Sequence, residues 1–275
     1  MQTDPILVIG ATGKTGSRIA TLLESKGHVV RRGSRGAAVP FDWDKPETWP
    51  AALVGVSSAY VSYFPDIAFP GAVESVEAFT AVARKAGLQR LVLLTGRGEH
   101  HAERAEEIIR RSGIPFTIVR AAWFAQNFSE GALLEPVMAG VLPMPGGDVL
   151  EPIVDVDDIA EVAVAALTED GHTGALYEVT GPRLMTFAEM AGELSAAIGR
   201  PVKHLPLSFE EFHAELFQAN GEMIADIITE IARETLDGRN ARLADGVQRA
   251  LGRPPREFRQ FARIAAADGA WAAAA

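Results

Sequence analysis

Cysteine is absent from the 275 residues, which excludes disulfides, thiolate nucleophiles and cysteine-ligated zinc. Also missing is an apolar run of the roughly 18 residues that a membrane-spanning helix needs. The first residues contain no basic segment followed by an apolar one, so no signal peptide is expected. These absences predict a cytoplasmic protein, in a reducing compartment, without a membrane partner.

Positive charge is in deficit, because the formal net charge is −10. Such a surface repels nucleic-acid phosphates unless a local basic patch overrides it. The short basic clusters outside the N-terminal region are expected to lie on solvated helix faces: Arg110 and Arg111, then Arg249, Arg253, Arg256 and Arg259. We therefore expect no nucleic-acid partner.

Short apolar runs alternate with helical patterns through the first half of the chain. Runs such as Ile6–Ile9, Ser58–Tyr63 and Arg90–Leu94 predict parallel strands buried on both faces. A second strand is expected to begin at His28, and a short third strand is expected at Ala38–Phe41. The pattern predicts an α/β fold with a doubly wound parallel sheet of the Rossmann type.

The second half is less regular. Residues 131–147 contain three prolines and four glycines, which predicts a loop-rich segment, and Ile153–Val154 is expected to form a short strand. From Ser208 to Ala267 the pattern is helical. We predict an NAD(P)-binding domain at 1–130 and a smaller, mostly helical C-terminal substrate lobe at 131–275. This lobe is expected to interleave with the first domain and not to fold independently.

The glycine-rich stretch 10–16 is the strongest motif, since it follows a strand and opens a helix. Gly10 permits a tight turn, Gly13 lets the backbone approach a pyrophosphate, and Gly16 lets the helix pack on the sheet. The free amides of the first helical turn favour an anion. Three side chains add donors: Thr12, Lys14 and Thr15. The motif predicts dinucleotide binding.

The end of the second strand discriminates between the two nicotinamide cofactors. An acid there would bind the ribose 2′-hydroxyl of NAD, but residues 31–35 contain none. Arg32, Ser34 and Arg35 instead offer donors that suit a 2′-phosphate. The sequence predicts NADP(H), with NAD(H) less favoured, and Asp42 is expected to reach the adenine amine.

Five stretches resemble the NmrA-like family of atypical short-chain dehydrogenases: Gly10–Gly16, Arg97–Glu99, Arg120–Phe128, Glu151–Ala160 and Tyr177–Pro182. The resemblance covers nearly the whole chain and implies a Rossmann fold that binds NAD(P). Members of the family include quinone, dye and ketone reductases. Others bind the dinucleotide without turnover and act as regulators, so the resemblance does not select a reaction.

The usual proton relay of short-chain dehydrogenases, a Tyr and a Lys four residues apart after the fifth strand, is missing. One alternative is that His100 or His101 donates the proton, with Thr95 as a further candidate. The other is that no dedicated acid exists, and water or a backbone group protonates a delocalised acceptor. Binding and orientation would then supply most of the acceleration.

The nicotinamide is expected at the carboxyl ends of the fourth to sixth strands. The residues there are Ser62, Tyr63, Thr95, Gly96, Arg97, Ala121 and Ala122. An apolar lid over a flat substrate is predicted from Trp123, Phe124, Phe128 and Met144, with Asn127 orienting a carbonyl. The acids at 155, 157 and 158 are expected to begin a helix, and no metal is expected.

These features predict an NADPH-dependent oxidoreductase of a small carbonyl, quinone-like or conjugated aromatic acceptor. The alternative is a catalytically silent NADP(H)-sensing regulatory protein that binds a protein partner. A homodimer is compatible with either function.

Overall fold

A six-stranded parallel sheet forms the larger domain of the computed structural model, which describes residues 4–272. The strand order is β2-β1-β3-β4-β5-β7, and every neighbouring pair is parallel. The bounds are β1 (Ile6–Ile9), β2 (Val30–Gly33), β3 (Ser58–Val61), β4 (Arg90–Gly96), β5 (Phe116–Ala121) and β7 (Leu176–Val179). The predicted doubly wound Rossmann-type sheet is confirmed.

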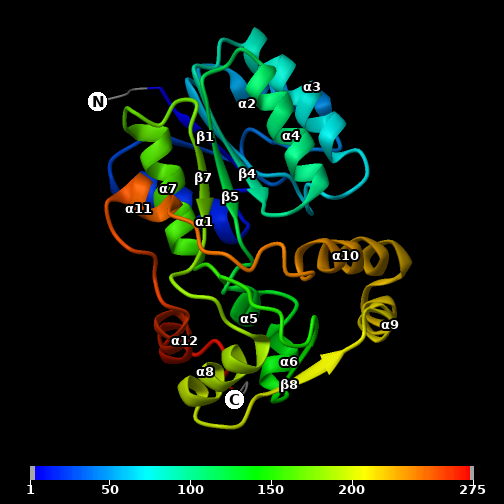
Figure 1. Ribbon diagram of the computed structural model, residues 1–275. Helices are drawn as coiled ribbons and strands as arrows, with labels where there is room; N and C mark the ends of the chain where they lie inside the picture. Colours follow the sequence, from blue (N-terminus) through cyan, green and yellow to red (C-terminus); the bar gives the residue numbers. More distant parts are fainter. Residues whose placement is uncertain (1–3, 273–275) are drawn as a thin grey trace.

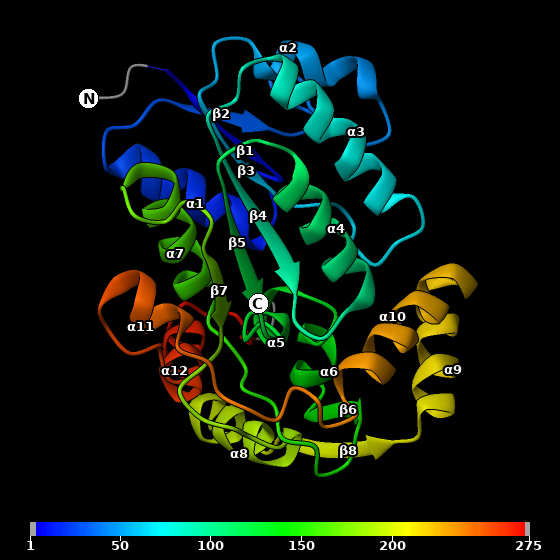
Figure 2. The ribbon, with the colours of Figure 1, turned by 45° about the horizontal axis from the view of Figure 1, so that its top comes forward.

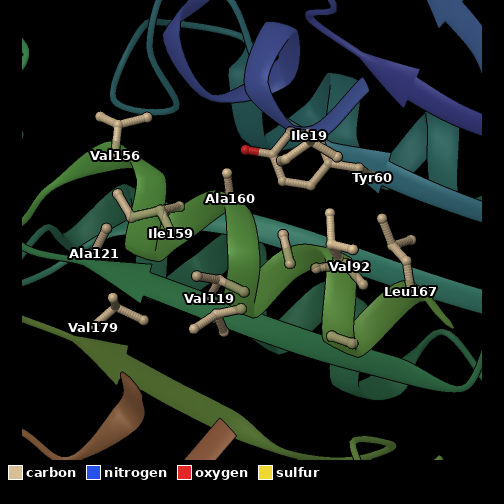
Figure 3. Close-up of a cluster of buried hydrophobic side chains, with 14 of the residues drawn as sticks. Ile19, Tyr60, Val92, Val119, Ala121, Val156, Ile159, Ala160, Leu167 and Val179 are labelled. Carbon is tan, nitrogen blue, oxygen red and sulfur yellow. The ribbon is translucent and has the colours of Figure 1, made fainter. Parts of the chain in front are cut away.

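Helices cover both faces of this sheet (Figure 1). One face carries α1 (Lys14–Ser25), α7 (Val156–Thr168) and, at the β7 edge, α11 (Gly246–Leu251). The other carries the turn η1 (Pro46–Thr48) with α2 (Trp49–Leu53), α3 (Ala72–Lys85) and α4 (His100–Arg111). Figure 3 shows α7 lying over the sheet with its apolar side chains against β4, β5 and β7. Burial of this helix on nearly every side explains its almost uninterrupted apolar sequence.

The predicted third strand at Ala38–Phe41 is wrong. Phe41 is buried because its ring packs edge-on against Trp43 and Phe79, with centroids 5.0 and 5.6 Å away. Its backbone amide donates to the carbonyl of Ser34, so the segment folds as a loop. Short apolar runs signal burial, and here aromatic packing rather than strand pairing provides it. The second strand also begins at Val30, later than expected.

A smaller lobe lies across the carboxyl ends of the strands (Figure 2). Its helices are α5 (Asn127–Glu130), α6 (Leu134–Met138), α8 (Phe187–Ile198), α9 (Phe209–Asn220), α10 (Glu222–Thr235) and α12 (Phe258–Ala267). Two parallel strands, β6 (Val141–Pro145) and β8 (Lys203–Leu207), complete it. Residues 131–147 are therefore less loop-rich than predicted, since they contain α6 and β6. The expected strand at Ile153–Val154 is only an isolated bridge between Phe124 and Val154.

The chain crosses between the two parts more than once. After β6 it returns to the larger domain for α7 and β7, and after α10 it returns again for α11. A buried cluster of ion pairs attaches the segment after α11 to α7. Asp158, with no exposed surface, accepts hydrogen bonds from the side chains of Arg253 and Arg256. The prediction that these arginines lie on a solvated face is wrong, because α7 supplies a buried partner.

The described residues include no helix that combines the length and apolarity needed to cross a bilayer.

Candidate functional site

The turn between β1 and α1 has the geometry that its glycines predict. Gly10 has φ +72°, and the amide of Gly13 donates to its carbonyl at 2.9 Å. A Cβ on Gly16 would lie 2.2 Å from the Gly10 oxygen, so helix and turn touch backbone to backbone. A Cβ on Gly10 would lie 2.7 Å from Ser62 Oγ, so the end of β3 adjoins the turn. A turn this tight lets the backbone approach a pyrophosphate closely, and the free amides of the first turn of α1 would bind it.

The three predicted side-chain donors of this turn face different ways. Thr12 is exposed, whereas Thr15 is buried and its Oγ1 accepts a hydrogen bond from Tyr60 Oη at 2.9 Å. The Thr15 hydroxyl therefore belongs to the core rather than to the turn surface. Lys14 is half-buried, and this burial lowers the pKa of its ammonium group. Thr12 and Lys14 remain the side chains placed to meet an anion.

A residue that the sequence did not single out links the turn to the smaller lobe. Arg18 on α1 pairs with Glu130 at 2.6 Å and with Asp157 at 2.8 Å. These carboxylates belong to α5 and to the first turn of α7. The pairing holds the start of α1 against both segments, so it helps to position the turn.

Three arginines lie in β2 or just after it, and one of them differs in role from the other two. Arg31 donates to the carbonyls of Ala52 and Val54, so it has a structural role. Arg32 is exposed and makes a two-pronged pair with Glu24, with N–O distances of 3.0 and 2.8 Å.

Arg35 and Ser34 lie beside this pair in the loop after β2. The guanidinium of Arg35 is 5.5 Å from the ring centroid of Phe64. Asp42 is used locally, since its Oδ1 accepts the amide of Asp44. Arg32, Ser34 and Arg35 thus form the edge where a 2′-phosphate is expected, and Glu24 competes for Arg32.

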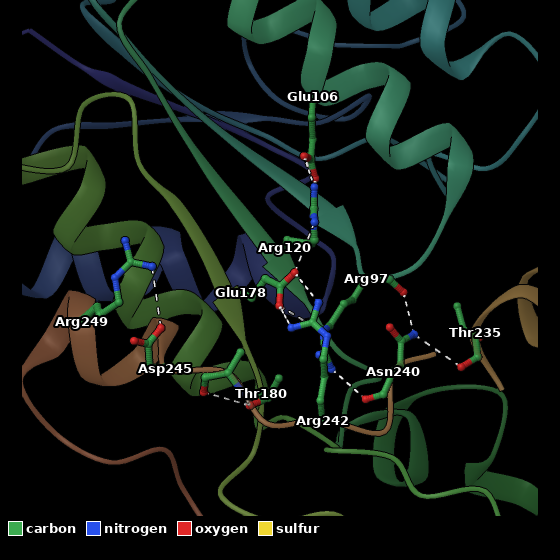
Figure 4. A network of polar contacts seen from close by, with 11 residues as sticks. Arg97, Glu106, Arg120, Glu178, Thr180, Thr235, Asn240, Arg242, Asp245 and Arg249 are labelled. Carbon is green, nitrogen blue, oxygen red and sulfur yellow. Dashed lines mark hydrogen bonds and ion pairs between the residues drawn. The ribbon is translucent and has the colours of Figure 1, made fainter. Parts of the chain in front are cut away.

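Polar contacts at the carboxyl ends of β4 and β5 run in two directions, from Arg120 to Glu106 and from Arg97 to Asn240 (Figure 4). Thr95 Oγ1 donates to Glu106 on α4 at 2.9 Å, and Glu106 also pairs with Arg120 of β5. The Thr95 hydroxyl is therefore engaged with α4, away from the place where a substrate is expected. Arg97 points the other way, and its backbone amide donates to the carbonyl of Ala121.

Arg97 is almost fully buried, with 3% of its surface exposed. Its Nη1 donates to the carbonyl of Asn240 at 3.0 Å, its Nε forms an ion pair with Glu178 Oε2 at 3.5 Å, and its Nη2 has no hydrogen-bond partner. Glu151, which is fully buried, has no partner for either side-chain oxygen. Burial raises the pKa of Glu151 to about 8, against a lowering effect from Arg97. The sequence singles out neither Glu151 nor Asn240 as a functional residue: Glu151 only begins one of the stretches that resemble the family, and Asn240 lies in none of them.

The predicted histidines lie further out, at the start of α4. His100 is mostly exposed, and its Nε2 is 3.6 Å from Glu234 on α10. His101 is half-buried. The ion pair of His100 is directed towards α10 and joins neither histidine to the phosphate turn, so proton donation by a histidine stays a prediction.

Of the four residues predicted to form the lid, two are partly exposed and two are buried in the core of the smaller lobe. Trp123 is partly exposed, and its Nε1 donates to Thr235 Oγ1 of α10 at 3.1 Å. Phe124 is also partly exposed, at the bridge to Val154. By contrast, Phe128 and Met144 are each 1% exposed and pack in the core of the smaller lobe. Trp123 and Phe124 are therefore better placed than these two to face a flat substrate.

The backbone of the segment after Phe124 is used to build α5. The amide of Asn127 donates to the carbonyl of Phe124, and the carbonyl of Asn127 accepts from Leu133. Its side chain is partly exposed. Orientation of a substrate carbonyl by Asn127 stays a prediction.

The acids at 155–158 begin α7, as predicted. The side chain of Asp155 accepts the amide of Asp157 at 2.9 Å, which is the usual geometry of a helix N-cap. Gln126 donates to the same carboxylate and accepts the amide of Val156. In residues 4–272, no group of three or more His, Asp or Glu side chains is arranged to hold a metal ion.

Glu99 predicts a measurable pH dependence of stability. Burial, with smaller contributions from Asp66 and Glu234, raises the pKa of its carboxyl from 4.5 to about 8. The folded protein therefore binds the Glu99 proton more tightly than the unfolded chain does. The contribution of this proton to the free energy of unfolding is complete below pH 4.5 and is lost as pH rises towards 8.

We expect the stability of the wild type relative to Glu99→Gln to fall by about 1.4 kcal/mol per pH unit within that window. Urea unfolding of both proteins at pH 5, 6, 7 and 8 measures it. A difference that stays constant across these values would contradict the assignment.

A glycine-rich phosphate turn at the end of β1, a doubly wound parallel sheet and a second lobe across its carboxyl edge define a Rossmann-type nucleotide-binding protein. No protein-family model matches the chain. It is 33% identical to the NAD(P)H azoreductase of Xenophilus azovorans, over 96% of this chain and 99% of that protein. The chain belongs to the NmrA-like family of atypical short-chain dehydrogenases, as its motifs predict.

Two further similarities agree with this assignment. The chain is 31% identical to the (4-alkanoyl-5-oxo-2,5-dihydrofuran-3-yl)methyl phosphate reductase of Streptomyces griseus, over 93% of this chain and 96% of the relative. The solved structure of the triphenylmethane reductase of Citrobacter sp., complexed with NADP(H), superposes with a TM-score of 0.75 at 24% identity. It covers 95% of this chain and 99% of that one, which supports the fold.

Proposed function

We propose that the protein is an NADPH-dependent oxidoreductase that reduces a small carbonyl, quinone-like or conjugated aromatic acceptor by hydride transfer. The observation that carries this proposal is the phosphate turn, which opens on the sheet edge that the smaller lobe covers. The relatives add support, since the names of two of them describe reduction of azo compounds and of an unsaturated lactone. Both are conjugated acceptors of the kind that the sequence predicts.

The chain would contribute binding and orientation at this edge. The amides of the first turn of α1 and the Lys14 ammonium would hold the pyrophosphate, while Arg32 and Arg35 would hold the ribose phosphate. When bound, the reduced dinucleotide supplies hydride at the carboxyl ends of β4 and β5. Trp123 and Phe124 would exclude water from the acceptor and keep it flat against the reacting edge.

Preference for NADPH is expected to depend on Arg35. We expect Arg35→Gln to weaken NADPH binding roughly tenfold, because one guanidinium contact to the 2′-phosphate is worth about 1.4 kcal/mol. The affinity for NADH should change less than twofold. Calorimetry with both nucleotides measures these affinities. Glu24→Gln tests the opposite change, because it removes the carboxylate that pairs with Arg32 and should therefore tighten NADPH binding. Equal weakening of both nucleotides by Arg35→Gln would contradict the assignment.

Turnover with a panel of quinones, azo dyes, conjugated enones and ketones tests the reaction. Loss of the nicotinamide absorbance with NADPH is expected for at least one conjugated acceptor. The missing Tyr–Lys pair supports a second candidate, an NADP(H)-sensing regulatory protein. Tight NADPH binding without turnover, unequal affinities for NADPH and NADP⁺, and capture of a protein partner would favour that second function and contradict the first.

A further inference from the structure

Glu99 places a carboxyl directly on the end of β4, an inner strand of the sheet. Gly96 is the last residue of β4 and pairs with Ala121, the last residue of β5. A Cβ on Gly96 would lie 1.8 Å from Glu99 Oε1, 2.3 Å from its Cδ and 2.6 Å from its Oε2. The carboxyl therefore fills the space that a side chain at position 96 would occupy. It lies at the edge of the sheet where the nicotinamide is expected.

The sheet face beside this carboxyl is partly uncovered. Side chains two residues apart in a strand point to the same face, so a side chain at position 96 would point as Leu94 does. Leu94 packs with the core on the face of α1 and α7, yet both Leu94 and Gly96 are partly exposed on an inner strand. Phe124 packs on the same core and is also partly exposed. Glu99, with 9% of its surface exposed, thus borders an opening on the face that carries α1 and the phosphate turn.

The position of the Glu99 side chain does not serve the stability of the fold. Glu99 is the N-cap residue of α4, but its side chain accepts no hydrogen bond from the amides of that helix in the described chain. It folds back over Gly96 instead, and its Oε2 is buried without a hydrogen-bond partner within residues 4–272. A cap would stabilise the helix, and a buried oxygen without a partner destabilises the protein. A polar group of a bound ligand would supply the missing partner.

The loop that carries Glu99 is fixed from both sides. Gly98 has φ +82°, a conformation that turns the chain back towards the end of β4. From the smaller lobe, Asn240 Nδ2 donates to the carbonyl of Arg97 at 3.0 Å, and Arg239 Nη1 donates to the carbonyl of Gly98 at 3.4 Å. The carboxyl is therefore held in place before any ligand arrives, as a preorganised catalytic group must be.

We propose that the Glu99 carboxyl is the proton donor of the reduction: it donates a hydrogen bond to the heteroatom of the acceptor and transfers its proton as hydride is delivered. This inference rests on the proposed reductase function. It assigns the role that the missing Tyr–Lys pair leaves open, since the hydroxyl of Thr95 is engaged with Glu106. The heteroatom is a carbonyl oxygen or an azo nitrogen that belongs to a conjugated group.

The step balances in atoms and electrons. The acceptor takes up hydride at one end of its double bond or conjugated chain, and the π electron pair moves to the heteroatom at the other end. The O–H bond of Glu99 breaks, and the proton forms a new bond to that heteroatom. The acceptor gains the two electrons that the nicotinamide loses. Glu99 is left as a carboxylate, and water returns a proton to it after product release.

The groups around Glu99 keep its carboxyl protonated near neutral pH. Burial raises the pKa of Glu99 to about 8, and the carboxylates of Asp66, in the loop after β3, and Glu234 add to this shift. Glu234 lies close by on α10, because its Oε2 accepts the backbone amide of His100 at 3.4 Å. A general acid works best when its pKa lies near the operating pH. Cations on the neighbouring segments are paired with other acids: His100 with Glu234, Arg97 with Glu178, and Arg239 with Asp237.

Glu99→Gln tests the inference, with methyl red and cyclohexenone as acceptors. Glutamine keeps the shape and a hydrogen-bond donor but has no proton to transfer. We expect kcat to fall at least ~100-fold with little change in KM, because a positioned acid typically contributes 10²–10⁴-fold. NADPH affinity by calorimetry should be unchanged. Glu103→Gln is the matched control, since it removes a carboxylate from an exposed position in the first turn of α4 and should retain the wild-type kcat.

The pH profile gives a readout that a purely structural role would not change. In the wild type, kcat/KM should fall as pH rises through about 8, because the acid must be protonated. Glu99→Gln should lose this dependence. Glu234→Gln removes a carboxylate that raises the pKa of Glu99, so the fall in kcat/KM should move to lower pH. The Glu234 side chain is partly exposed, so this variant tests the inference even if Glu99→Gln fails to fold.

The infrared band of the protonated carboxyl gives a readout without turnover. At pH 7 the wild type should show a band that Glu99→Gln lacks and Glu103→Gln retains. With NADP⁺ in place of NADPH no hydride can be transferred, so methyl red can bind without reacting. The band should then shift to lower frequency, because the carboxyl donates a hydrogen bond to the dye.

The possible failures are distinguishable. If the wild type reduces an acceptor while Glu99→Gln keeps its kcat and pH profile, or if methyl red leaves the carboxyl band unshifted, Glu99 is a structural acid and the inference is overturned. Loss of NADPH affinity in Glu99→Gln without loss of kcat would also overturn it, because the carboxyl would then hold the dinucleotide. If the wild type binds NADPH but reduces no acceptor, the proposed function fails and the inference fails with it.

Discussion

Replacement of Gly16 by alanine is expected to abolish dinucleotide binding. The added Cβ would lie 2.2 Å from the oxygen and 2.6 Å from the carbonyl carbon of Gly10, and backbone atoms cannot rotate aside. The turn must move, so the amides that face the pyrophosphate lose their alignment. We expect NADPH affinity to fall at least ~100-fold and stability to fall by about 3 kcal/mol. Calorimetry and urea unfolding measure the two effects.

Gly192→Ala is the matched control, because Gly192 also lies inside a helix, α8. No heavy atom outside the local helix lies within 4 Å of its added Cβ. Alanine is a better helix former than glycine by about 1 kcal/mol, so this variant should be stabilised by roughly that amount and bind NADPH normally. Normal NADPH binding by Gly16→Ala would show that the turn does not hold the pyrophosphate.

Replacement of Asp158 by asparagine is expected to give the largest loss of stability. Asp158 has no exposed surface, and it accepts from Arg253 Nη2 at 2.7 Å, from the Arg256 backbone amide at 2.7 Å and from Arg256 Nη1. Loss of the Asp158 charge leaves Arg253 and Arg256 with the single carboxylate of Glu161 between them, and breaking a buried ion pair costs about 3 kcal/mol. Urea unfolding measures the loss, and limited proteolysis should cut the chain near the α11–α12 connection.

Asp157→Asn provides the comparison, one residue away on the same helix. Its side chain is 49% exposed and pairs with Arg18 in contact with solvent. An exposed pair of this kind contributes roughly 1 kcal/mol or less. Equal losses for the two variants would mean that burial of the Asp158 cluster does not hold the C-terminal segment to α7.

The parts of the site that lie within one stretch of chain were accessible from the sequence. Gly10 and Gly16 are six residues apart and specify a strand, a turn and a helix through local sterics alone. The capping boxes that open α8 and α9 are equally local, and both are formed. By contrast, the apolar run Ala38–Phe41 predicts a strand that does not form, because a short apolar run indicates burial but not which neighbours provide it.

Residues that meet only in the folded chain could not be paired in advance. Arg97 follows β4, Glu178 lies in β7 and Asn240 follows α10, so nothing local relates these three residues. The same holds for Arg253 and Asp158, which the sequence presented as a solvated basic residue and a helix start. Their partnership depends on the path by which the chain re-enters the larger domain.

The class of fold, the phosphate turn and the family follow from the sequence alone, because each depends on short-range geometry or on a linear order of motifs. Three features are visible only in the folded chain: Thr15 faces the core, Glu24 pairs with Arg32, and the buried Arg97 meets Glu178 and Asn240. Burial and electrostatic pairing arise between segments far apart along the chain, so no local pattern reveals them. Their strength depends on the surrounding dielectric, which only the packed chain creates.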